Sequence, residues 1–150
     1  MLEYLCENGL STKFIQQSNY PTGQVNVHLS ETKDASYEIV FPSAWDYIHK
    51  PETIPQFDIL VYGSLSCRNK TSFETLISLL DSGAIKVFDV NFRPPFVDQS
   101  IIEQLLKKAD LVKMNHEELF QISAWNGFES EDLELAADLV FKKYSLKILC

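Results

Sequence analysis

Apolar and polar residues alternate differently before and after residue 57, which divides the chain into two parts. Between Gln24 and Leu29 every second residue is apolar, which is the period-two pattern of a strand with one apolar and one polar face. Strands with two unlike faces suit an antiparallel flap. The pattern predicts a helix over residues 2–8, which Gly9 ends, and then β elements over residues 13–17, 23–30 and 36–41.

After residue 57, short apolar runs alternate with amphipathic helical patterns. The runs lack polar alternation, as expected of strands covered on both faces, and they predict strands over residues 58–62, 85–90, 111–114 and 146–149. The helices are predicted over residues 72–80, 100–108, 117–123 and 131–143. This order indicates βαβ units with right-handed crossovers. The predicted fold class is α/β in one domain over residues 1–150: a parallel sheet with flanking helices over residues 57–150, and a small β lid over residues 13–41.

Composition narrows the classes of function. The length of 150 residues, with 45% hydrophobic and 23% charged residues, suits one ordinary globular domain. A net charge of −8 without a basic patch argues against a nucleic-acid partner. No apolar run approaches the ~20 residues of a membrane span, and no basic segment follows Met1, so we expect no membrane partner and a cytoplasmic location. The cysteines are odd in number and far apart, which predicts reduced thiols rather than a disulfide framework or a zinc site.

The first candidate site follows the strand predicted over residues 85–90. Asp89, Asn91 and Arg93 occupy alternate positions, so in an extended chain their side chains point the same way. A carboxylate, an amide and a guanidinium in a row can hold a polyol, and ligands of parallel sheets bind beyond the carboxyl ends of the strands. An ordinary strand end explains the same residues, with Asn91 capping a turn and Arg93 pairing with Asp89.

The second candidate site follows the next strand. Asn115 stands where a helix begins and Glu118 follows it by three positions, which is the spacing of a capping box. A functional interpretation is also open, because a helix N-terminus at the carboxyl edge of a sheet suits phosphate. Lys113 adds positive charge there, and Glu118 offers a hard oxygen ligand for a magnesium-bound water.

Together these two stretches, D-x-N-x-R and K-x-N-x-x-E, resemble the PfkB (ribokinase-like) carbohydrate kinases, especially the fructokinase and 2-keto-3-deoxygluconate kinase branch. The resemblance covers nearly the whole chain. It includes the helix end at Glu7 to Gly9, the Thr22-Gly23 that opens the lid strands, and the Gly63-Ser64 after the first parallel strand.

The resemblance implies a kinase that binds ATP, Mg²⁺ and a sugar of the fructose or keto-sugar acid type. Its cofactor-binding residues would be Lys113, Asn115 and Glu118, with Glu118 serving the metal. Its sugar-binding residues would be Asn91 and Arg93, joined more weakly by the lid residues Gln24, Asn26 and His28. In the family the lid closes over the sugar and often forms a dimer contact, so the resemblance also implies a homodimer through the lid strands.

Two family motifs do not occur in this sequence: the paired glycines with a sugar-binding Asp, and the G-A-G-D signature that supplies the anion hole and the catalytic base. The chain therefore resembles the central half of such an enzyme, no catalytic residue is assigned, and we expect the isolated chain to lack activity. The alternative is a non-catalytic fragment or interaction domain derived from a sugar kinase. A dehydrogenase half is disfavoured, because no G-x-G-x-x-G follows any strand.

Overall fold

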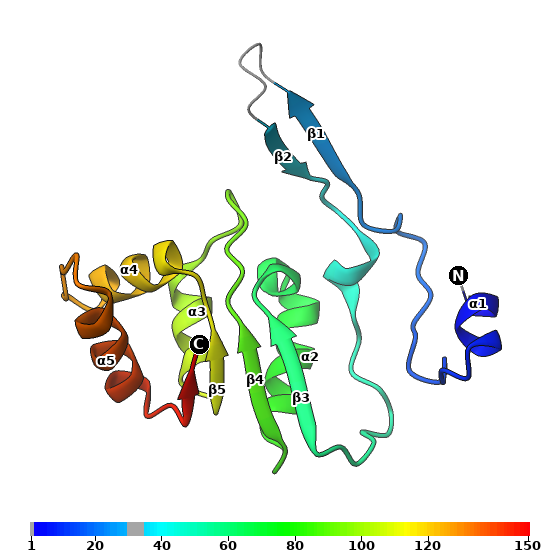
Figure 1. Ribbon diagram of the computed structural model, residues 1–150. Coiled ribbons are helices and arrows are strands. Elements are labelled where there is room, and N and C mark those ends of the chain that lie inside the picture. Colours follow the sequence, from blue (N-terminus) through cyan, green and yellow to red (C-terminus); the bar gives the residue numbers. More distant parts are fainter. Residues whose placement is uncertain (1, 30–34) are drawn as a thin grey trace.

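The computed structural model describes residues 2–29 and 35–150. Its larger part is a four-stranded parallel sheet in the order β3-β4-β5-β6, with helices between the strands (Figure 1). The strands are β3 (Ile59–Gly63), β4 (Ile85–Asp89), β5 (Leu111–Lys113) and β6 (Ile148–Leu149). The helices are α2 (Lys70–Leu80), α3 (Gln99–Leu106), α4 (His116–Trp125) and α5 (Leu133–Tyr144). The α/β class predicted from the alternating pattern is confirmed.

The register of the sheet brings the two sequence motifs together. Asp89 at the end of β4 is the partner of Gly63 at the end of β3, and also of Lys113 at the end of β5. The carboxyl ends of three neighbouring strands therefore form one row. The loops that follow these strands leave the sheet at the same edge, which is where ligands of parallel sheets bind.

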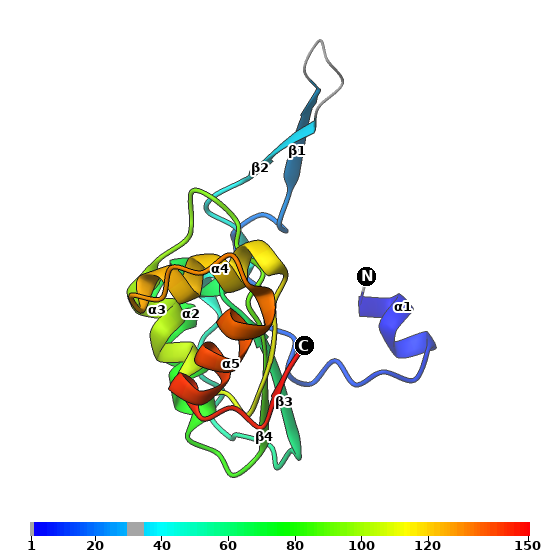
Figure 2. The same cartoon turned by 60° about the vertical axis from the view of Figure 1, so that its left-hand side comes forward.

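The core fills one face of the sheet. Phe88 and Val112 are fully buried beneath α3 and α4, whose Ile102, Leu105 and Ile122 are also buried. Figure 2 shows α2 to α5 on one side of the sheet and α1 (Leu2–Glu7) on the other.

The opposite face of the sheet is open in the described part of the chain. Val61 is 67% exposed, and the alternate positions Ile59, Ile85 and Ile148 are exposed as well. The expectation that the strands are covered on both faces is wrong for these residues. The cause of the error is that β-branched side chains on an open face give the same continuous apolar run as those on a buried face.

The predicted lid is an antiparallel hairpin of β1 (Val25–Leu29) and β2 (Ala35–Ile39), with Val27 opposite Tyr37. It projects beyond the carboxyl ends of the parallel strands (Figure 1). The strand predicted over residues 36–41 begins and ends earlier than expected. Ser30, the predicted end of the first strand, lies outside the described residues.

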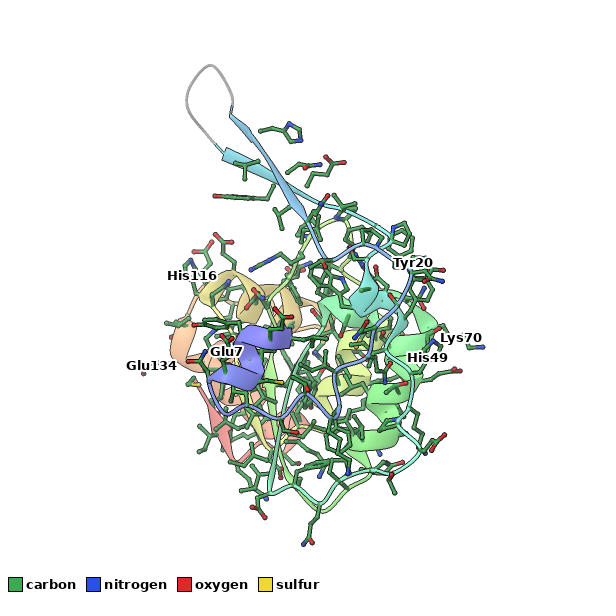
Figure 3. The ribbon with its side chains drawn as sticks, turned by 90° about the vertical axis from the view of Figure 1, so that its right-hand side faces the viewer. Glu7, Tyr20, His49, Lys70, His116 and Glu134 are labelled. Atoms are coloured by element: carbon green, nitrogen blue, oxygen red, sulfur yellow. The ribbon has the colours of Figure 1, made fainter. Side chains whose placement is uncertain are left out.

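The β element predicted over residues 13–17 is wrong. This segment is irregular and contains a turn in which the Ile15 N–H donates to the Thr12 carbonyl. The Gln16 side chain forms hydrogen bonds with both backbone groups of His49, a residue that is labelled in Figure 3. The Gln16 side chain thus holds the segment in place. The apolar residues of the segment resemble those of a strand, but no neighbouring strand pairs with it in the described part of the chain.

Two 3₁₀ helices, Ala44–Tyr47 (η1) and Leu65–Arg68 (η2), were not predicted, because turns this short have no periodicity. Among the described residues, no helix is both long and apolar enough to cross a bilayer.

The cysteines allow a first prediction. Cys67 is 1% exposed, and burial raises the pKa of its thiol to about 11, whereas Cys6 and Cys150 are exposed. Because the thiolate is the reactive form, we expect a thiol reagent at mildly alkaline pH to label Cys6 and Cys150 quickly and Cys67 only after unfolding. Mass spectrometry of labelled peptides distinguishes the sites. Equally fast labelling of Cys67 in the folded chain would contradict the packing around η2.

Candidate functional site

An ion pair joins the ends of β4 and β5. The Lys113 Nζ lies 3.0 Å from the Asp89 Oδ1, and the two side chains are 65% and 42% exposed. This bond and the negative charge of Asp89 raise the pKa of Lys113. Asp89 thus pairs with Lys113, and the pairing of Arg93 with Asp89 that an ordinary strand end suggested is not formed.

The loop after β4 turns sharply at Asn91. Its φ of 50° lies in the left-handed region, which asparagine tolerates better than most residues. The chain is therefore not extended there, and the expectation of a straight row from Asp89 to Arg93 is wrong. Arg93 is exposed and its Nη1 donates to the Phe92 carbonyl at 2.8 Å. Its exposure leaves the outer part of the guanidinium accessible to a ligand.

Glu118 joins the two motif segments. The helix α4 begins after Asn115, whose Oδ1 accepts the Glu118 N–H at 2.9 Å, while the Glu118 Oε2 accepts the Asn115 N–H at 2.9 Å. The predicted capping box is therefore present. The other carboxylate oxygen, Oε1, accepts the Phe92 N–H at 2.7 Å, and Glu118 is only 6% exposed. One buried carboxylate thus holds the loop after β4 against the first turn of α4.

The contact between Glu118 and Phe92 was missed from the sequence. Its donor is a backbone N–H, which every residue except proline carries. No residue type marks such a partner, so only the adjacency of the two loops could have indicated it.

A pocket of about 360 Å³ lies between this loop and α4. Its lining includes Arg93, Asn115, Glu117 and Glu118. The guanidinium and the helix N-terminus suit anionic oxygens. The carboxylate and amide oxygens are the hard ligands that Mg²⁺ prefers, and each carboxylate oxygen of Glu118 has a second lone pair beyond its backbone bond. The described residues include no cluster of three or more carboxylate, histidine or cysteine side chains that could hold a metal ion directly, so these oxygens suit contact with the waters of a Mg²⁺ ion.

The polar residues of the lid are not part of this pocket. Gln24, Asn26 and His28 are exposed on the hairpin. Asn26 donates to the Glu38 Oε2 at 3.1 Å, and the His28 Nε2 lies 3.3 Å from the same oxygen. The bond from Asn26, and secondly that from His28, lowers the pKa of Glu38. The structure thus groups Asn26 and His28 around Glu38, a residue that the sequence analysis did not consider although it stands opposite Asn26 in the hairpin.

Comparison with known proteins gives one matching family and several solved structures of similar fold. The family described as pfkB family carbohydrate kinase matches residues 1–148. None of the curated proteins matches the sequence.

Three solved structures illustrate the similarity of fold. The fructokinase from Xylella fastidiosa has a TM-score of 0.77 at 21% identity, over 98% of this chain and 49% of that chain. The apo fructokinase from Vibrio cholerae O395 has a TM-score of 0.75 at 18% identity, over 99% of this chain and 53% of that chain. A PfkB family carbohydrate kinase from Listeria grayi has a TM-score of 0.76 at 15% identity, over 98% of this chain and 49% of that chain. The chain thus spans about half the length of these structures.

Some of the similar structures contain ligands. The Xylella fastidiosa fructokinase has also been solved with bound ATP, and the Vibrio cholerae enzyme with fructose, ADP and a calcium ion.

Proposed function

The chain belongs to the pfkB family of carbohydrate kinases, and from this we propose that it contributes to an enzyme that transfers a phosphoryl group from ATP to a hydroxyl of a sugar. The observation that carries the proposal is the bond from the Phe92 N–H to Glu118, which unites both motif segments beside one pocket. We call the enzyme that carries this segment the parent enzyme.

On the phosphate side, Lys113 and the N-terminus of α4 would hold the phosphates of ATP. Asn115 and Glu118 would orient the waters of a Mg²⁺ ion, which supplies charge neutralisation when bound. In phosphoryl transfer the protein mainly positions the reacting groups and stabilises the charge on the transferred phosphoryl group. The positive charge of Lys113 at the end of β5 fits that task.

On the sugar side, Arg93 and Asn91 would bind a ketose of the fructose type or a keto-sugar acid. Fructose in a similar solved structure supports this substrate class. Gln24 and Asn26 would join them when the hairpin closes over the pocket. The hairpin also exposes Val25, Val27 and Tyr37, which a homodimer through the lid strands would bury. We place the enzyme in the cytoplasm.

The alternative is an interaction domain without catalysis. It is favoured by the local bonds that already engage the candidate residues, since Glu118 and Asn115 cap a helix and Lys113 pairs with Asp89. A domain that kept the motifs only as caps and turns would show the same contacts.

We expect the isolated chain to release no ADP in a sugar-dependent manner, because its 150 residues contain no G-A-G-D signature to supply the base and the anion hole. The parent enzyme should release ADP with at least one member of a panel of ketoses and keto-sugar acids. A coupled ADP assay with a heat-inactivated control measures both. Turnover by the isolated chain would mean that the active site is complete within it, whereas an inactive parent enzyme would favour the interaction domain.

A further inference from the structure

Arg68 forms a buried ion pair beyond the carboxyl end of β3. Its Nε donates to the Asp46 Oδ1 at 2.6 Å and its Nη2 to the Asp46 Oδ2 at 2.9 Å. The side chains of Arg68 and Asp46 are 3% and 0% exposed. Two charges removed from water are retained only with close pairing, and the two-pronged geometry provides it at Nε and Nη2. The third nitrogen, Nη1, is buried without a hydrogen-bond partner among the described residues.

The ion pair is hydrogen-bonded to the base of the hairpin. The Arg68 Nη2 also donates to the carbonyl of Val40, the residue that follows β2, at 2.9 Å. Asp46 accepts the Ser43 N–H at 2.7 Å, and the Ser43 Oγ donates to the same Val40 carbonyl at 2.9 Å. The four residues therefore form a closed hydrogen-bond network where the hairpin joins the rest of the chain.

The Arg68 guanidinium also faces the loop that carries Arg93. It lies 4.4 Å from the centroid of the Phe96 ring and 5.1 Å from that of Phe41, distances at which a cation attracts an aromatic ring. The Phe96 N–H donates to the Arg93 carbonyl at 2.9 Å. Arg68 thus contacts the hairpin through Val40 and Phe41, and the Arg93 loop through Phe96.

Further contacts hold the segments around the pair. In η1, the Trp45 carbonyl accepts the Ser72 Oγ at 2.7 Å, so α2 holds the helix that carries Asp46. The Trp45 ring lies so close to Gly23 that a Cβ there would stand 1.9 Å from it. Both strands of the hairpin are therefore anchored next to Arg68, one through Gly23 and the other through Val40.

We propose that Arg68 is a positioning residue that couples the base of the lid hairpin to the loop that carries Arg93. Its role in catalysis rests on the proposed function, in which the lid and Arg93 face the same sugar. The guanidinium sets the relative placement of these two segments, while Asp46 keeps its charge compensated.

Hydrogen exchange on the isolated chain tests the coupling without any activity. In Arg68→Met the amides of Ser43 and Phe96 should exchange roughly ten- to a hundredfold faster, because a charged hydrogen bond of this kind is lost. The amides of Phe88 and Val112 in the sheet should be unchanged. Lys108→Met is the matched control, since it breaks the exposed ion pair with Asp81 and should leave the exchange rates of Ser43 and Phe96 unchanged.

Two further variants keep the test informative. Arg68→Lys retains the charge but lacks the planar guanidinium. Its exchange rates at Ser43 and Phe96 should therefore lie between those of the native chain and those of Arg68→Met. Should Arg68→Met not fold because Asp46 is left as an unpaired buried charge, the double variant Arg68→Met/Asp46→Asn removes that charge. Unchanged exchange at either Ser43 or Phe96, or equal acceleration at Phe88 and Val112, would overturn the proposal.

In the parent enzyme, Arg68→Met should lower kcat/KM for the sugar by roughly tenfold or more while leaving the KM for ATP unchanged. Arg68→Lys should recover part of the loss. Equal losses for sugar and ATP would reduce Arg68 to a purely structural role. If the proposed function fails, no variant has activity to lose, and the exchange pattern alone decides whether Arg68 couples the two segments.

Discussion

Replacing Glu118 by glutamine is expected to lower the free energy of unfolding of the chain by about 2–4 kcal/mol, since hydrogen bonds to a buried charged group contribute about 1.5–3 kcal/mol each. Both carboxylate oxygens accept backbone N–H groups, from Phe92 at 2.7 Å and from Asn115 at 2.9 Å. Glutamine keeps one acceptor and turns an NH₂ group toward the other N–H donor. For a domain of this size the melting temperature should fall by roughly 4–16 °C.

Urea and thermal unfolding of the isolated chain measure this loss. Glu117→Gln is the matched control, because Glu117 is exposed in the same helical turn and its replacement should change stability by at most about 0.5 kcal/mol. Equal stability of both variants would mean that Glu118 does not hold the two loops together.

The Mg²⁺ titration of the parent enzyme separates the two roles of Glu118. If Glu118 orients magnesium-bound waters, Glu118→Gln shifts the dependence on Mg²⁺ to higher concentration at temperatures where the variant is fully folded. A lower melting temperature with an unchanged titration would leave Glu118 as a capping residue.

The parallel sheet was predictable because its signal is local. The run that ends in Phe88 and Asp89 and the helix start at Asn115 can be recognised within a few residues, and the adjacency of successive parallel strands then follows from chain order. The capping box was predictable for the same reason, since Asn115 and Glu118 lie within one helical turn.

The sequence could not reveal contacts between distant segments. Arg68 and Asp46 are 22 positions apart, and a lone arginine and aspartate in connecting loops have the pattern of surface residues. Their burial follows from the packing of η1, η2 and the aromatic rings around them, which no periodicity records. The left-handed backbone at Asn91 was hidden likewise, because asparagine is also common in ordinary turns.

Replacing Arg93 by lysine is expected to lower kcat/KM of the parent enzyme for its sugar roughly ten- to a hundredfold, because the planar fork of a charged donor is lost. Stability should hardly change. The Arg93 side chain is exposed and donates to the carbonyl of its neighbour Phe92, and a substitution at such a surface position changes the free energy of unfolding by about 0.5 kcal/mol or less.

The matched comparison is Arg68→Lys, which replaces the only other arginine of the sequence. Both substitutions keep the charge and remove the fork, but Arg68 is buried in a hydrogen-bond network whereas Arg93 lies open at the pocket. Arg68→Lys should therefore lower the unfolding midpoint, and Arg93→Lys should not. If Arg93→Lys leaves both the catalytic efficiency and the midpoint unchanged, Arg93 is a solvated loop residue, and the sugar must bind to other side chains at the edge of the sheet.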